Sequence, residues 1–309
     1  MKLSKLLALS SAASVALFAA NPALADDHAE AKAETANAVL KSGPEGPALW
    51  KVADEDTTIY MFGTIHALPK EIEWYDAEIA EALTSSDAVV TEIKMDPGSE
   101  AAMQQLAISK GMLPAETTLR SLLSDEQTAS YEAAMTKIGL PVGAFDRLEP
   151  WMAALSLTML PLMQQGYSPD AGVDKVILKK AGDKEQQALE TAEFQINIFD
   201  SLPQESQVQF MMEAAEGIDE VKTVLDTMVA EWVEGDAEAL AAIMNEGMTD
   251  PMVAEKLLYE RNKNWAEWID TRLDSPGTIF IAVGAGHLAG EKSVQDYLAE
   301  RGISTDRVQ

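Results

Sequence analysis

The sequence predicts an α/β protein with a mixed central sheet, built from both ends of the mature chain, and a large helical section between them. Apolar, β-branched runs lie near the two ends, at TIYMFG (58–63), DAVVTEI (87–93) and TIFIAV (278–283). Residues 98–273 between them carry mostly helical patterns. The strand–helix–strand order near the N-terminal end favours parallel strands. We therefore expect a single α/β domain over residues 48–309, with a helical insertion at about 98–273.

The first 25 residues have the features of a secretory signal peptide. A short basic segment precedes an apolar stretch, Leu6–Ala20, and small residues at Ala23 and Ala25 predict cleavage after Ala25. Residues 26–47 are rich in alanine, acids, glycine and proline, which is typical of a flexible, acidic lead-in. The sequence therefore predicts a protein of the periplasm or the exterior of the cell.

Composition excludes several classes of function. The formal net charge of −28 becomes −30 when the two lysines of the signal peptide are removed, and such a chain repels nucleic acid and anionic membrane surfaces. The chain has no cysteine, which excludes a cysteine nucleophile, a thiolate-bound zinc and a lipid anchor on cysteine. The apolar stretch at 151–163 is shorter than the roughly 20 residues of a spanning helix, and we expect no membrane span.

The remaining elements follow from local patterns. Residues 48–52 and 58–63 predict a hairpin, and Ser124–Gln127 resembles a capping box that opens a helix. Pro150 is expected to open a buried helix. The other elements that we expect are helices at 74–83, 172–181, 201–273 with interruptions, and 291–301, and a weak strand at 186–191.

Two of the three histidines occupy matching places in the sequence. His66 follows Gly63 by three residues, His287 follows Gly284 by three residues, and each motif comes just after a predicted strand. Glu92 lies near the end of a third predicted strand. Ligands bind beyond the carboxyl ends of strands in open α/β sheets, so neighbouring strands would bring these side chains together. Two imidazoles and one carboxylate leave coordination positions open, which is typical of a catalytic metal site.

Other interpretations of these residues remain open. A single histidine near a strand end is often only a hydrogen-bonded core or loop residue. The glycines Gly284, Gly286 and Gly290 resemble a dinucleotide-binding loop, but only 19 residues follow, too few for a full unit of that type. A serine–histidine–aspartate triad is possible in principle, although no serine lies in a recognisable nucleophile motif.

Several short motifs together resemble a known family. These are GTIH at the end of one strand, VVTEI on the next, a GVD segment, LET followed by a glutamine, RNxxW on a late helix, and a strand that ends in GxGH. Together they resemble the TraB/GumN family over roughly residues 47–303. Related members, the Tiki proteins, are described as metal-dependent proteases that cleave the amino terminus of Wnt proteins. The resemblance implies a core shared with erythromycin esterase and with haem-binding lipoproteins of the ChaN type.

The resemblance also implies roles for individual residues. His66, Glu92 and His287 would be the metal ligands or catalytic residues, and Gly63, Gly284 and Gly286 belong to their motifs. Glu190 and Asp174 match further recurrent positions. Our own hypothesis is that one of them takes or delivers a proton, and the alternative is a helix cap or a solvated charge. Arg261 also matches a recurrent position; it would neutralise a carboxylate in the site, bind a carboxylate of the substrate, or form only a salt bridge on the helix face. Gly172, Gln195 and Asn262 match further recurrent positions, whereas Trp265 and Trp268 are expected in the core.

The leading hypothesis from the sequence is an exported metal-dependent hydrolase that acts on peptides or proteins. A divalent ion such as Mn²⁺, Co²⁺ or Zn²⁺ would activate water at His66, Glu92 and His287. The first alternative is a periplasmic protein that binds haem or a metal, because a histidine at the rim of a sheet can ligate haem iron. The second alternative is a non-catalytic partner in the assembly of the envelope or of a polysaccharide.

Overall fold

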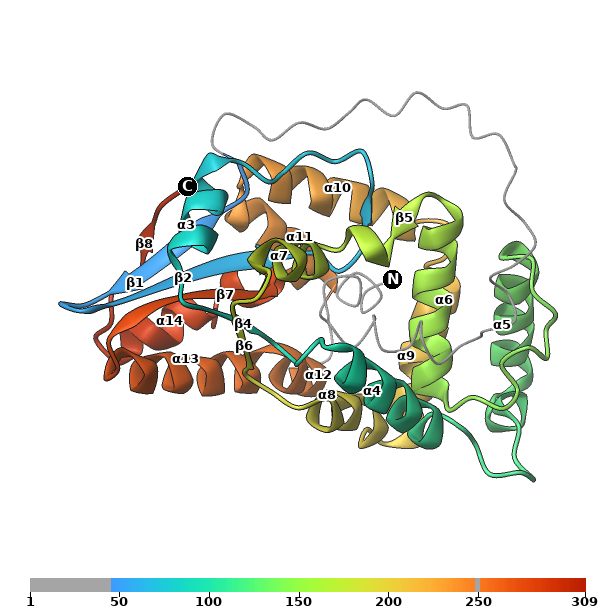
Figure 1. Cartoon of the computed structure of the whole chain (residues 1–309). Helices are drawn as coiled ribbons and strands as arrows, with labels where there is room; N and C mark the ends of the chain where they lie inside the picture. The colour runs from blue at the N-terminus through green and yellow to red at the C-terminus, as the bar shows by residue number, and fades with distance from the viewer. Residues whose placement is uncertain (1–45, 248–250) are drawn as a thin grey trace.

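The computed structural model describes residues 46–247 and 251–309, and its centre is a six-stranded mixed sheet (Figure 1). The predicted signal peptide and most of the acidic lead-in, residues 1–45, lie outside the described residues. The strand order is β6-β4-β7-β2-β1-β8. The strands of this sheet are β1 (Leu49–Ala53), β2 (Thr57–Thr64), β4 (Ala88–Thr91), β6 (Glu185–Ala188), β7 (Gly277–Gly284) and β8 (Asp306–Arg307). The predicted α/β class is therefore confirmed.

The C-terminal strand β7 pairs in parallel with both β2 and β4, and it separates them. Strands β2 and β4 are therefore parallel, as predicted, but they are not neighbours. The predicted hairpin is confirmed, because β1 and β2 are antiparallel. Strand β6 comes from the helical middle section and pairs with β4, so the sheet is not built from the two chain ends alone.

Side chains alternate along the strands between two apolar cores. On β7, Ile279 and Ile281 belong to the core beneath α13 (Glu260–Leu273) and α14 (Val294–Glu300), whereas Phe280 faces the opposite core. The opposite face is covered by α3 (Ala77–Ser85), α7 (Val173–Ala181) and α10 (Val221–Glu234), as Figure 1 shows.

The middle of the chain is mainly helical, as predicted. Helix α6 (Pro150–Gln164) is buried along most of its length and packs against α9 (Gln204–Glu216). Helix α5 (Asp125–Lys137) begins with the predicted capping box of Ser124 and Gln127. The other helices of the section are α4 (Pro97–Lys110), α8 (Ala192–Asp200), α11 (Ala237–Gly247), α12 (Pro251–Ala254), the π-helix η3 (Glu255–Tyr259) and the 3-10 helices η1 (Leu119–Leu122) and η2 (Pro169–Ala171). None of the helices in the described part of the chain is long and apolar enough to cross a membrane.

Several boundaries differ from the sequence prediction. Helix α3 begins at Ala77 rather than at residue 74, because the side chain of Asp76 caps its first turn. The last helix begins at Val294, where Ser293 is the cap. The prediction missed α8 and a small second sheet of β3 (Leu68–Pro69) and β5 (Tyr167–Ser168).

Candidate functional site

The carboxyl ends of β2, β7 and β4 lie at one edge of the sheet and carry the three residues of the GxxH and VVTEI motifs. Thr64 on β2 pairs with Gly284 on β7, and the last residue of β4 pairs with a residue two positions before Gly284. His66 follows β2, Glu92 follows β4, and His287 lies in the 3-10 helix η4 (Ala285–Leu288) after β7. All three side chains are buried.

A buried arginine connects most of these residues. Nε and Nη2 of Arg261 bind the two carboxylate oxygens of Glu190 at 2.8 and 2.9 Å. Nη2 also donates to Oε2 of Glu92 at 2.6 Å, and Nη1 contacts the carbonyl of Leu257 at 3.0 Å and Nε2 of His287 at 3.1 Å. The five N–H groups of the guanidinium therefore all face acceptors within this cluster. Arg261 neutralises carboxylates of the protein, and none of its N–H groups is left to bind a carboxylate of a substrate.

Further donors hold the two glutamates of the Arg261 cluster. The backbone N–H of Gly284 donates to Oε1 of Glu92 at 2.8 Å. The Gln195 amide donates to both Glu92 and Glu190 at 2.9 Å, and the Trp265 indole donates to Glu190 at 2.9 Å. The charges of Glu92 and Glu190 outweigh the effect of burial, which alone lowers the pKa of Arg261, and the net result is a raised pKa. The guanidinium therefore remains charged.

His287 is held in a neutral form with one defined tautomer. Because the guanidinium of Arg261 can only donate, Nε2 of His287 accepts, and the ring proton lies on Nδ1. Nδ1 then donates to Oδ1 of Asn262 at 2.5 Å, and the Asn262 amide donates to the carbonyl of Lys292 at 2.8 Å. Burial and the charge of Arg261 lower the pKa of His287 well below its ordinary value.

His66 has a different environment. Its Nδ1 lies 3.1 Å from Oδ1 of Asp174 at the start of α7, whereas its Nε2 is buried without a hydrogen-bond partner in the described part of the chain. Burial alone lowers the pKa of His66, but the charge and hydrogen bond of Asp174 and the charge of Glu92 raise it above the ordinary value. A cavity of about 20 Å³ adjoins His66, Glu92 and Asp174, with Met95 and Met103 on its wall. This volume suits one water molecule.

The predicted metal ligands do not form a coordination set in this arrangement. No group of three histidine, aspartate or glutamate side chains within residues 46–247 and 251–309 has the geometry to hold a metal ion. The reason is that Arg261 lies against both Oε2 of Glu92 and Nε2 of His287. The cavity beside His66 is also far smaller than the roughly 300–1,000 Å³ of an organic ligand site, so it does not fit haem.

The glycines of the motifs allow close approaches of the backbone. A Cβ atom at Gly172 would lie 2.4 Å from the carbonyl oxygen of His66, and one at Gly63 would lie 3.0 Å from Cα of Ala285. A Cβ atom at Gly286 would meet only the flexible end of Met244. Gly172 and Gly63 therefore keep the two histidine loops against their neighbours.

The sequence interpretation missed two residues of the site. Trp265 was expected only in the core, but it donates to Glu190 and its ring packs 4.2 Å from that of His287, between centroids. Its position four residues after Arg261, on the same helix face, was the available signal. The hydroxyl of Thr64, inside the GTIH motif, is buried and unpaired among the described residues.

Comparison with known proteins confirms the family that the sequence motifs resemble. A family model described as the TraB/PrgY/gumN family matches residues 48–307, which include His66, Glu92, Arg261 and His287. No curated protein and no solved structure gives a significant match. The chain therefore belongs to the TraB/PrgY/gumN family.

Proposed function

We propose that the protein is an exported hydrolase of peptide bonds in which His66 and Asp174 form the acid–base pair. The observation that carries this proposal is the buried, unpaired Nε2 of His66, next to a cavity of the size of one water molecule. Asp174 accepts the Nδ1 proton and leaves the lone pair of Nε2 free to take a proton from water. The chemistry of a histidine oriented by a carboxylate is typical of general base catalysis.

The Arg261 cluster has a supporting role in this proposal. The negative charge of Glu92 acts on His66 and raises its pKa. Hydrogen bonds from Arg261, Gln195 and the backbone of Gly284 hold the carboxylate of Glu92 in place. His287 stays neutral, so it adds no positive charge that would lower the basicity of His66. Arg261 is therefore a positioning residue for Glu92 and His287.

The proposal is tested by hydrolysis of a peptide library, followed by mass spectrometry. We expect His66→Ala and Asp174→Asn to lose turnover, by about 100-fold or more for the histidine because general base catalysis contributes on that order. Asp170→Asn is the matched control, since Asp170 is an exposed residue near Asp174 whose ion pair is with Lys175. The rate should rise with pH through the raised pKa of His66, because the base must be neutral. Full activity of His66→Ala would contradict the proposal.

A metal-dependent reaction is the second candidate, because the family resemblance implies one and one observation favours it. Nδ1 of each histidine is held by a second side chain, Asp174 or Asn262, as in metal-binding histidines. Nε2 of His66 has no partner among the described residues, whereas Nε2 of His287 accepts from Arg261. This candidate requires Arg261 to leave Glu92 and His287. Turnover measured with a chelator and after addition of Mn²⁺, Co²⁺ or Zn²⁺ separates the two candidates.

Export is part of the same proposal. Cleavage after Ala25 would give a mature chain that begins at Asp26. The mass of the protein recovered from the periplasm or the medium tests this, and a full-length chain confined to the cytoplasm would contradict it.

A further inference from the structure

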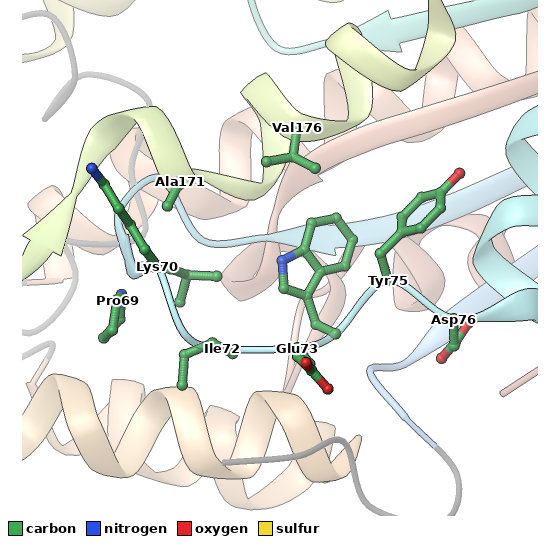
Figure 2. A pocket seen from close by; sticks show the side chains of 10 residues that line it. Pro69, Lys70, Ile72, Glu73, Tyr75, Asp76, Ala171 and Val176 are labelled. Atoms are coloured by element: carbon green, nitrogen blue, oxygen red, sulfur yellow. The ribbon is translucent and has the colours of Figure 1, made fainter. Parts of the chain in front are cut away.

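A second cavity, of about 440 Å³, lies next to the segments that carry the His66–Asp174 pair. One wall is the loop from Leu68 to Asp76, and the other is formed by Ala171 and Val176 (Figure 2). The volume is within the range of small-ligand sites, roughly 300–1,000 Å³. The cavity therefore lies between two segments that are far apart in the sequence.

The same two segments build the histidine pair and this pocket. The loop begins two residues after His66, and Ala171 and Val176 lie on either side of Asp174 in the sequence. The backbone N–H of Val173 donates to the carbonyl of Ile65 at 2.9 Å, which ties the segments together beside the pair. A ligand in the pocket therefore contacts the same two backbone segments that position His66.

The pocket has a rigid aromatic wall with one free donor. Trp74 stacks on Phe62 with 5.7 Å between ring centroids and meets Trp232 edge-on at 5.7 Å. The Trp74 side chain is only 5% exposed, and its Nε1 forms no hydrogen bond among the described residues. Unlike Nε1 of Trp151, which is sealed in the core, this atom is not closed off from solvent. A largely buried indole usually has a partner for its N–H, so this donor is available to a ligand.

The rest of the pocket is lined by both apolar and charged side chains. Pro69, Ile72 and Val176 supply aliphatic surface. Lys70 and Glu73 are exposed at the rim and form no ion pair within residues 46–247 and 251–309. Asp76, the third charged side chain of the pocket, already accepts hydrogen bonds from Ile79 and Gln309. The two remaining charges have opposite signs and favour neither a strong anion nor a strong cation. The chemistry suits a neutral, dipolar ligand with a large apolar group and a hydrogen-bond acceptor next to it.

We infer that this pocket binds a bulky apolar side chain of a peptide substrate, whose backbone carbonyl accepts the N–H of Trp74. The inference rests on the proposed peptide hydrolysis and adds a preference for aromatic or branched aliphatic residues near the cleaved bond. The apolar side chain packs between the loop and α7, and the carbonyl satisfies the free donor.

Binding of a capped amino acid tests the pocket without any catalysis. The probe is N-acetyl-phenylalanine methylamide, compared with N-acetyl-alanine methylamide, and binding is measured by saturation-transfer NMR on the full mature chain carrying His66→Ala. We expect Ala171→Trp to abolish binding of the phenylalanine probe by filling the pocket. Trp74→Phe keeps an aromatic ring but removes the N–H, and it should weaken binding about three- to tenfold. Trp268→Phe, a half-buried tryptophan on α13, is the control.

Each outcome decides either the pocket or the reaction. Equal binding of both probes, or binding of the phenylalanine probe that survives Ala171→Trp, would overturn the inference. Unchanged binding of the phenylalanine probe by Trp74→Phe would also overturn the inference. If Trp74→Phe does not fold, Val176→Trp replaces it, and unchanged binding by that variant would overturn the inference as well. Probe binding without any hydrolysis by the parent protein would reject the proposed reaction but retain the pocket. Hydrolysis that is lost in His66→Ala but unchanged in the pocket variants would reject the pocket as a substrate site and retain the proposed reaction.

Discussion

Replacement of Arg261 by methionine is the sharpest test of the site as a charge-balanced cluster. Arg261 is 2% exposed and contacts two buried glutamates, Glu92 and Glu190. Methionine keeps an unbranched stem, although a shorter one, and removes the charge and all five N–H donors. The carboxylates of Glu92 and Glu190 would then be buried without their cation, although Gln195 and Gly284 still donate to Glu92.

The expected loss of stability is large. Removal of one partner from a buried ion pair costs about 3–5 kcal/mol, because the remaining charge stays uncompensated in a low-dielectric environment. A single domain is stable by only about 5–15 kcal/mol, so Arg261→Met should lose about a fifth or more of the free energy of unfolding. Two glutamates and His287 lose a partner together, which favours the upper part of this range.

Urea unfolding at pH 7, followed by circular dichroism, measures this loss. The midpoint should fall while the slope with urea stays constant, since the same surface is exposed on unfolding. Arg120→Met is the matched control, because Arg120 also binds two carboxylates, Asp146 and Glu132, but its side chain is 33% exposed. Solvent screens that ion pair, so the control should be much less destabilised.

A double variant separates charge from packing. Glu190→Gln in the Arg261→Met background removes one uncompensated carboxylate, so the double variant should lose less stability than the sum of the two single variants. The coupling between them should be about 0.5–3 kcal/mol. If Arg261→Met loses no more stability than Arg120→Met, or if the two substitutions in the cluster add without coupling, the description of the site as a charge-balanced cluster is wrong.

Three other predictions follow from the same contacts. His66 has a raised pKa in the folded protein, so its contribution to stability is complete below about pH 6.5 and is lost as the pH rises through the raised value; His66→Gln should remove this slope from the urea midpoints. Gly172→Ala should destabilise the fold by about 1–3 kcal/mol through the 2.4 Å approach to the carbonyl of His66, whereas Gly98→Ala, at the start of α4, should have little effect in the same urea assay. Arg261→Met should bind Mn²⁺ more tightly than the parent in calorimetry, because it frees Nε2 of His287 and Oε2 of Glu92 for a cation; an equal or weaker affinity would show that the guanidinium does not compete with the metal.

The sequence predicts well those parts of the fold that have strong local patterns. The runs around β2 and β7 are apolar and β-branched, and their glycines mark the strand ends, so the strands and the following histidines were located correctly. The insertion of β7 between β2 and β4 depends on pairing between strands that are far apart in the sequence, which no local pattern contains. Strand β6, with the sequence EQQA, is polar and short, and its role at the edge of the sheet follows only from the pairing with β4.

The site shows the same division. His66, Glu92 and His287 could be found because rare residue types occur at matching strand ends. The role of Arg261 could not be assigned, because the sequence leaves open whether its fork faces a substrate or the protein. The structure shows that all five donors face protein acceptors. The pocket beside Trp74 could not be predicted from the sequence either, because its walls come from segments that meet only in the folded chain.

The charges at the edge of the sheet explain why the two histidines differ although their motifs match. His287 lies against the guanidinium of Arg261, so a second positive charge on its ring is unfavourable. His66 faces Asp174 and the charge of Glu92, so a proton on its ring is favourable. The distribution of charge therefore supports His66 as the residue that moves the proton and His287 as part of the cluster that holds Glu92 in place.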